Sequence, residues 1–347
     1  MLHVDLPGET KGGVAHQVSR LAQTLVERGH EVTVISLSPA PRGAAYSVHR
    51  ISLPARLRRS RTARFVTVPL AYALRSYGQF DVVHAHGDSH LLLRRRSAVV
   101  RTFHGSAREE ARSARRLRRK ALQTALVGGE HLARRLATVA VGISENTCRS
   151  IGGLDAVIPC GVDRRLFRPG EKSERPSILF VGTMNGRKRG EAVVHAFSTT
   201  VRRAIPSAEL WLVADRSVEG EAIRSWGLVD DATLAGLYRR AWAFTMPSSY
   251  EGFGVPYLEA MASGTPVVAT PNAGAIEFVR PDTGGLVVDE TMLGACLASL
   301  LRRPAERARL GANGRAFSRR FDWPQIAAAY EDMYELARAR VRRSSQR

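Results

Sequence analysis

The chain has 347 residues, too many for one ordinary hydrophobic core, so two domains are expected. An apolar content of 44% and a charged content of 24% are typical of a globular protein, and no uncharged run is both long enough to cross a bilayer and free of helix breakers. The net charge of +20 attracts polyanions and anionic membrane surfaces without specificity, and it says little about the fold.

The cell compartment is predicted from the first residues and from the cysteines. The opening string MLHVDLPG lacks the basic region and apolar stretch of a secretory signal. Three cysteines, Cys148, Cys160 and Cys296, are widely spaced and follow no metal-ligand pattern. We therefore expect reduced thiols in a cytoplasmic protein.

The first domain begins with a strand, a helix and a second strand. We expect a strand at Leu2–Leu6, a glycine-rich loop, a helix from Val14 to about Gly29, and a strand at Glu31–Leu37. Such a unit predicts a parallel sheet with a right-handed crossover. Further strands are predicted at Ser47–Ile51, Phe80–His84, Ala98–Phe103, Thr138–Ile143 and Ala156–Ile158. We assign residues 1–163 to this Rossmann-like domain.

A polar, proline-containing linker at 164–176 separates it from a second α/β series at 177–321. The predicted strands of the series are Ile178–Val181, Leu210–Ala214, Trp242–Met246, Pro266–Thr270 and Leu286–Val288, and its predicted helices are Glu191–Arg203, Asp231–Ala241 and Met292–Arg303. Residues 322–347 are predicted to form a final helix, with apolar side chains available for packing, and a frayed tail.

The most informative stretch runs from Pro247 to Thr270 and reads PSSYEGFGVPYLEAMASGTPVVAT. A flexible loop leads to Pro256, which suits the first turn of a helix because it lacks an N–H that would be unpaired there. Gly264 ends this helix, and a short buried strand follows. Two carboxylates, Glu251 in the loop and Glu259 in the helix, are thereby fixed at defined places.

The string resembles the EGFG…E signature (Glu, seven residues, Glu) of glycosyltransferase family 4. The resemblance extends over most of the chain and is strongest from Tyr238 to Glu277. It implies the GT-B fold, an α/β architecture of two doubly wound Rossmann-like domains that face each other across a cleft. It also implies a C-terminal helix that crosses back to the first domain, and retaining sugar transfer.

By this resemblance the donor occupies the second domain. Glu251 would hold hydroxyls of the donor sugar, the backbone at Phe253 and Gly254 would lie near the sugar and phosphate, and Glu259 would accept hydrogen bonds from the ribose. A vicinal diol suits a carboxylate because two O–H donors meet two oxygens. Without the resemblance, both glutamates would read as exposed charges of a loop and a helix start.

Glycines and cations after two strands are the candidates for binding the diphosphate. Gly12 and Gly13 follow the first predicted strand, and backbone there can approach a phosphate at a helix N-terminus, although an ordinary strand–helix turn looks the same. Gly182 follows a strand of the second domain. Lys188 matches a lysine of the family, and Arg187 substitutes for an arginine whose place is taken by Thr183; both suit the charge of a departing diphosphate.

Histidines end two strands of the first domain. His104 resembles the histidine that lies beside the transferred sugar in the family, whereas a lone histidine is more often structural. His84 and His86, in the string VVHAHG, are assigned to the acceptor side. They could form a metal pair, but the resemblance implies catalysis without a metal, so we predict no metal site.

A basic helix around Arg108–Lys120 is the candidate for contact with an anionic membrane. Four arginines recur at helical spacing along one face: Arg112, Arg115, Arg116 and Arg119. A solvated helix packed by its apolar side is the alternative. Because this helix contains no aromatic residue on which a base could stack, specific recognition of nucleic acid is not expected.

The sequence therefore predicts a retaining glycosyltransferase that moves a sugar from a nucleotide diphosphate sugar to an acceptor hydroxyl. The donor is a co-substrate, with UDP-sugar favoured, and no cofactor is expected. The acceptor would be an envelope or lipid-linked glycan or a small natural product. The alternatives are a GT-B epimerase or phosphorylase, and a non-catalytic protein that binds polyanions or membranes through its arginines.

Overall fold

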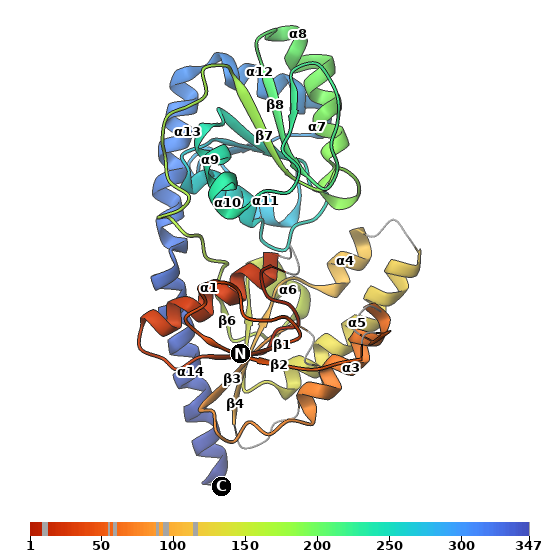
Figure 1. The fold of residues 1–347 in the computed structure, drawn as a ribbon, viewed down its shortest axis with the longest axis vertical. Helices are drawn as coiled ribbons and strands as arrows, with labels where there is room; N and C mark the ends of the chain where they lie inside the picture. Colours follow the sequence, from red (N-terminus) through yellow and green to blue (C-terminus); the bar gives the residue numbers. More distant parts are fainter. Residues whose placement is uncertain are drawn as a thin grey trace. The chain divides into compact units, whose positions relative to one another are not determined.

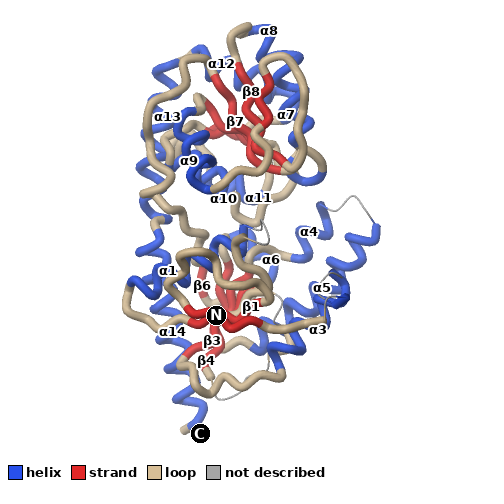
Figure 2. Tube along the Cα trace, in the orientation of Figure 1, coloured by secondary structure: helices blue, strands red, loops and turns tan. Residues whose placement is uncertain are grey.

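The structure is a computed structural model that describes residues 1–8, 13–54, 56–57, 61–87, 90–92, 97–113 and 117–346. It divides into two compact units, which we describe separately. Unit 1 comprises Met1–Gly161 and Trp323–Arg347, and unit 2 comprises Val162–Asp322. In each unit the strands lie at the centre and the helices lie outside them (Figures 1 and 2). None of the described helices is long and apolar enough to cross a membrane.

Unit 1 is a parallel α/β unit. Its strands are β1 (Thr33–Ser36), β2 (Ser47–Arg50), β3 (Val82–His86), β4 (Ala98–Phe103), β5 (Val139–Gly142) and β6 (Ala156–Val157). Its helices are α1 (Gly13–Glu27), α3 (Arg61–Ala73), α4 (Ala107–Ser113), α5 (Leu117–Leu136), α6 (Glu145–Ile151) and α14 (Trp323–Ser345).

The predicted strand Leu2–Leu6 is reduced to a short segment that joins two parts of the sheet. Leu2 forms parallel bridges to Ile35 of β1 and to Ala85 of β3. Its N–H donates to the His84 carbonyl at 2.8 Å, and its own carbonyl accepts from the His86 N–H at 2.9 Å. The spatial order is therefore β2, β1, the Leu2 segment, β3, β4, β5 and β6, with all pairs parallel.

The final helix, α14, packs on unit 1, as the GT-B resemblance implied (Figure 1). It buries Trp323, Ile326 and Tyr330 in one apolar cluster with Leu21 of α1 and Val100 of β4. Such burial is the main stabilising term for a helix of this kind, about 25 cal/mol per Å² of apolar surface removed from water. The last helix thus completes the core of the unit in which the chain begins.

Unit 2 holds a six-stranded parallel sheet. Its strands are β7 (Ser177–Gly182), β8 (Glu209–Ala214), β9 (Ile223–Ser225), β10 (Ala243–Met246), β11 (Val267–Ala269) and β12 (Gly285–Val287). Its helices are η1 (Gly186–Lys188), α7 (Gly190–Ala196), η2 (Phe197–Val201), α8 (Arg202–Ala204), α9 (Asp231–Arg240), α10 (Val255–Ala262), α11 (Ala273–Phe278), η3 (Glu290–Met292), α12 (Leu293–Arg302), α13 (Pro304–Phe317) and η4 (Ser318–Phe321).

The strand order of this sheet is β12-β11-β10-β7-β8-β9. The chain runs outward from β7 to β9, returns beside β7 as β10, and then runs outward on the other side. The direction of winding thus changes between β7 and β10. In open parallel sheets the carboxyl ends of two such strands leave a crevice where ligands bind.

One predicted helix is replaced by a different arrangement. A single basic helix around Arg108–Lys120 does not form, since α4 ends at Ser113 and α5 begins at Leu117. Gln123 of α5 donates to Glu110 of α4 at 2.8 Å, a contact that two residues so far apart on one continuous helix could not make. Arg112 is exposed and pairs with Glu109 at 2.7 Å. Arg115 and Arg116, and the side chain of Arg119, lie outside the described residues.

Candidate functional site

The change of winding in unit 2 brings together two side chains that are distant in the sequence. The loop after β7 carries Lys188 and the loop after β10 carries Glu251, and β7 and β10 are paired. The Lys188 ammonium lies 2.8 Å from Oε1 of Glu251. The Arg187 guanidinium lies 3.7 Å from Oε2 of the same carboxylate. One carboxylate therefore faces two cations at the edge where a ligand is expected.

Glu251 and Lys188 are largely removed from water, whereas the Arg187 side chain is 41% exposed. Glu251 is 4% exposed, and the Lys188 side chain is also mostly covered. Burial lowers the pKa of Lys188, and the charge of Glu251 opposes this shift. Because desolvation strengthens electrostatic interactions, an anionic ligand that reaches Lys188 gains more than it would at a solvated surface.

The loop with the two cations is held mainly by its backbone. Asp215, at the end of β8, accepts a hydrogen bond from the Met184 N–H at 2.8 Å. The Arg187 carbonyl accepts from the Ser249 N–H at 2.8 Å, which ties this loop to the one that carries Glu251. A Cβ on Gly182 would lie 3.0 Å from Cβ of Lys188, so glycine leaves room for the lysine stem.

Glu251 is fixed by the first turn of α11, the helix that follows β11. The Gly274 N–H donates to the Glu251 carbonyl at 3.1 Å. A Cβ on Gly274 would lie 2.3 Å from the Phe253 carbonyl oxygen, so only glycine allows this approach. Phe253 itself is buried and stacks on Phe278, with ring centroids 5.0 Å apart. Its backbone, not its ring, is therefore the part available to a ligand.

Gly254 precedes α10 in a left-handed conformation, with φ of 100°. A Cβ there would lie 2.5 Å from the ring of Tyr257, whose hydroxyl donates to the Met246 carbonyl at the end of β10. Glycine is required at this position for both conformation and space. The helix that follows holds Glu259 in place.

Glu259 is a carboxyl group with a strongly altered proton affinity. Burial raises its pKa to about 8, and the nearby charge of Asp231 adds to the shift, while the neighbouring Tyr238 hydroxyl opposes it. At neutral pH the group is mostly protonated, so it presents a donor as well as acceptors. A protonated carboxyl can both donate to and accept from a vicinal diol.

The equivalent edge of unit 1 carries the predicted histidines. His86 ends β3, and His104 follows the end of β4. Nδ1 of His86 lies 3.0 Å from Nε2 of His104. Burial lowers the pKa of His104 to about 3, and the nearby His3 adds to the effect, so the His104 ring is neutral at physiological pH.

Both ring nitrogens of His84 are hydrogen-bonded within unit 1. His84 is 2% exposed, Nδ1 lies 2.8 Å from the Tyr334 hydroxyl, and Nε2 lies 2.8 Å from the Thr102 hydroxyl. The Thr102 hydroxyl in turn donates to Tyr330 at 3.1 Å. Both ring nitrogens thus help to fasten α14 to the sheet, and an acceptor contact by His84 does not fit this arrangement.

Of the glycines predicted in unit 1, Gly13 is the first residue of α1 and Gly12 lies outside the described residues. Within the described part of the chain, no group of three or more histidines, cysteines and carboxylates is placed to hold a metal ion.

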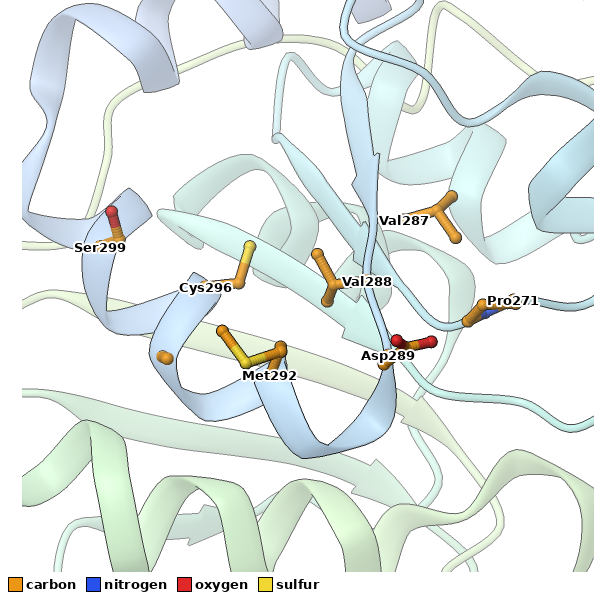
Figure 3. Close-up of a pocket in the computed structure, with 8 residues that line it drawn as sticks. Pro271, Val287, Val288, Asp289, Met292, Cys296 and Ser299 are labelled. Atoms are coloured by element: carbon orange, nitrogen blue, oxygen red, sulfur yellow. The ribbon is translucent and has the colours of Figure 1, made fainter.

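A separate pocket of about 490 Å³ lies beside α12 (Figure 3). Its lining combines apolar side chains with a carboxylate, a thiol and a hydroxyl: Pro271, Val287, Val288, Asp289, Met292, Ala295, Cys296 and Ser299. None of the predicted site residues lines it.

Sequence reasoning missed Asp215 and Gly274. Each acts through a backbone hydrogen bond to another loop, and such contacts leave no local pattern. The only available signal was the position of Asp215 directly after one predicted strand and of Gly274 a few residues after another, since strand ends meet at one edge of a parallel sheet.

Comparisons with known proteins show the family and the fold. Residues 11–166 match the model of Glycosyltransferase Family 4, and residues 175–303 match that of Glycosyl transferases group 1. The MMP alpha-(1->4)-mannosyltransferase of Mycolicibacterium hassiacum is 32% identical, over 95% of this chain and 96% of that protein.

Two solved structures share the fold. The sucrose-phosphate synthase of Thermosynechococcus elongatus matches with a TM-score of 0.79 and 24% identity, over 93% of both chains. Anabaena HepE in complex with UDP-glucose matches with a TM-score of 0.75 and 17% identity, over 96% of this chain and 98% of that one. The chain therefore belongs to glycosyltransferase family 4, and it is a retaining glycosyltransferase of the GT-B fold that uses a nucleotide-sugar donor.

Proposed function

We propose that the chain binds a UDP-sugar at the carboxyl edge of the unit 2 sheet and transfers the sugar to a hydroxyl of a carbohydrate or polyol. The contact of Lys188 and Arg187 with the buried Glu251 carries this proposal. It combines cations for a diphosphate with a carboxylate for sugar hydroxyls within one cluster. Glu259 holds the ribose, and the backbone at Gly182 and Gly254 lies against the phosphates and the sugar.

In the proposed reaction, the bond between the anomeric carbon and the diphosphate oxygen breaks as the acceptor oxygen bonds to the same face of that carbon. The acceptor proton passes to the departing phosphate, so that no protein nucleophile is needed. Lys188 and Arg187 stabilise the charge that gathers on the diphosphate. Removal of one such preorganised group costs on the order of 10²–10³ in turnover.

UDP is proposed as the nucleotide because Anabaena HepE, which shares the fold, was solved with UDP-glucose. The direct test is thermal unfolding with UDP, GDP, ADP and TDP. A nucleotide present at a hundred times its dissociation constant stabilises the native state by about 2.7 kcal/mol. UDP should raise the midpoint most, and Glu259→Ala should remove the effect; a larger shift with another nucleotide would overturn the choice of UDP.

Product analysis then separates transfer from the two other enzymatic reactions on this fold. Transfer requires an acceptor, an epimerase converts the nucleotide sugar alone, and a phosphorylase requires inorganic phosphate. The M. hassiacum relative is named a mannosyltransferase, so mannose is the first donor sugar to try, with lipid-linked glycans and small polyols as acceptors. Consumption of donor without any glycoside product would contradict transfer.

We also propose a peripheral contact with an anionic membrane, in a protein that is otherwise cytoplasmic. Three apolar side chains on and just after α3 support it: Val66, Leu70 and Leu74, which are 57%, 46% and 74% exposed. They are spaced four residues apart and therefore lie along one side of the helix. The net charge of +20 favours an anionic surface. Flotation with phosphatidylglycerol vesicles should recover the protein, Leu70→Ser with Leu74→Ser should weaken recovery, and phosphatidylcholine vesicles should not retain it.

A further inference from the structure

His86 occupies a special place in unit 1. Its strand, β3, lies next to the Leu2 segment, and the chain winds outward in opposite directions on the two sides of this pair. The carboxyl end of β3 is therefore the equivalent, in unit 1, of the place where Lys188 and Glu251 meet in unit 2. His86 is the last residue of that strand.

His86 is held through both its ring and its backbone. It is 2% exposed, and its ring centroid lies 3.9 Å from that of His84. The His86 carbonyl accepts a hydrogen bond from Nδ1 of His3 at 3.0 Å. In this packing Nδ1 of His86 faces Nε2 of His104, 3.0 Å away.

The hydrogen-bond pattern assigns the tautomers. Nε2 of His86 is buried and has no hydrogen-bond partner among the described residues. In a neutral imidazole one nitrogen donates and the other accepts. A buried N–H without a partner is rarer than a buried acceptor without one, which places the hydrogen of His86 on Nδ1. His86 then donates to Nε2 of His104, and the hydrogen of His104 must be on Nδ1.

We infer that His86 is a positioning residue that fixes the ring orientation and the tautomer of His104, so that His104 presents its Nδ1–H as a donor to an oxygen of the bound substrate. The inference rests on the proposed function and on the family resemblance, which implies that His104 lies beside the transferred sugar. Among the described residues, the only hydrogen bond of the His104 ring is the one to His86, so Nδ1 is left for the substrate. A hydrogen bond to one ring nitrogen commonly decides which nitrogen of a functional histidine carries the hydrogen.

The first test is spectroscopic and does not depend on turnover. Long-range ¹H–¹⁵N correlation spectra of the whole chain, labelled with ¹⁵N-histidine, distinguish the two tautomers, and His104→Asn identifies the signals of that ring. We expect the hydrogen of His104 on Nδ1 in the wild-type protein and a mixture of tautomers in His86→Leu. A hydrogen on Nε2 in the wild type, or an unchanged His104 spectrum in His86→Leu, would overturn the inference.

The second test is kinetic and uses the UDP-sugar that the wild-type protein consumes fastest. His86→Leu should lower kcat about ten- to a hundredfold, since a small misplacement of a functional group costs up to about 10²-fold, with the donor KM changed less than twofold. In His86→Asn the amide nitrogen takes the place of Nδ1, so most of kcat should return. Equal losses in both variants would contradict a role through this hydrogen bond.

Double variants separate positioning from a general loss of structure. His86→Leu should add no further loss of kcat to His104→Ala, because both remove the same contact. Tyr334→Phe, which removes the hydroxyl bonded to His84, is the matched control, and its effect should multiply with that of His104→Ala. If the wild type consumes no nucleotide sugar, the proposed function fails, and the spectra still decide whether His86 positions His104.

Discussion

The Lys188 ammonium lies 2.8 Å from the Glu251 carboxylate at the point where the sheet of unit 2 changes its direction of winding. Lys188→Met would leave this buried carboxylate with Arg187, at 3.7 Å, as its one remaining cation among the described residues. Removing one partner of a buried pair is strongly destabilising, and with Arg187 still present we expect a loss of about 2 kcal/mol. Turnover of the UDP-sugar should fall about 10²–10³-fold. Thermal unfolding and donor consumption measure the two effects.

Arg224→Met is the matched control for that variant. Arg224 pairs at 2.8 Å with Glu209, a buried carboxylate of the same unit that also faces Arg175 and the Trp211 indole. We expect a smaller loss of stability and an unchanged turnover. If Arg224→Met lowered turnover as much as Lys188→Met does, the effect of Lys188 would be one of stability alone.

Gly254→Ala should destabilise unit 2 and abolish donor binding. The substitution places a side chain at φ of 100°, which costs about 1–3 kcal/mol, and overlaps the Tyr257 ring. Gly152→Ala, also at positive φ but with open space around it, carries the backbone cost alone. The UDP-induced shift of the unfolding midpoint should vanish in Gly254→Ala and persist in Gly152→Ala. Persistence in both would show that the shape of the loop at Gly254 does not matter.

The raised pKa of Glu259 predicts a pH dependence of stability. Its pKa of about 8 in the folded chain exceeds the ordinary value of 4.5, so the native state binds the extra proton. The stabilisation from this proton is complete below about pH 4.5 and is lost as the pH rises through 8. Glu259→Gln should therefore gain stability relative to the wild type between pH 5 and pH 9, by about 1 kcal/mol or more.

Urea unfolding midpoints at the two pH values check this prediction, and Glu174→Gln, at an exposed position, controls for the loss of a charge. A constant difference between the wild type and Glu259→Gln over the whole range would mean that Glu259 is ionised throughout.

The pair of Arg28 and Glu331 predicts the opposite dependence in unit 1. The guanidinium bonds both carboxylate oxygens, at 2.8 and 2.6 Å, and these bonds and the nearby His30 lower the pKa of Glu331 to about 2. The stabilisation is present above about pH 4.5 and is lost as the pH falls toward 2. Because the pair is partly solvated, we expect this contribution to be small. Acid unfolding of Arg28→Met should lack this contribution, whereas an acid limb identical to that of the wild type would exclude it.

Much of this site was predictable because local signals and topology agree. Pro256 and Gly264 mark the start and the end of a helix, and α10 is observed at Val255–Ala262. The strand order of a doubly wound sheet brings Lys188 close to Glu251. By contrast, α13 was not predicted. It packs against α10 through glycines, and a Cβ on Gly311 would lie 2.5 Å from the Gly264 carbonyl, so the buried face carries no apolar periodicity.

The string VVHAH shows a second limit of sequence reasoning. His84 and His86 are two positions apart in a strand and therefore point to the same face of the sheet. What separates their roles is the cover supplied by α14, whose Tyr334 reaches the first histidine and not the second. Tyr334 lies 250 positions after His84 in the chain, and no local sequence pattern indicates a contact over that distance.

The division of the chain has a consequence for its synthesis. Unit 2 is one continuous segment, inserted between the two parts of unit 1. It can fold as soon as it has left the ribosome, because every strand of its sheet is then present. Unit 1 is translated first but lacks Trp323, Ile326 and Tyr330 until α14 has been made. The unit that begins the chain is therefore completed last. During translation the part of its sheet that α14 covers is not yet buried by that helix.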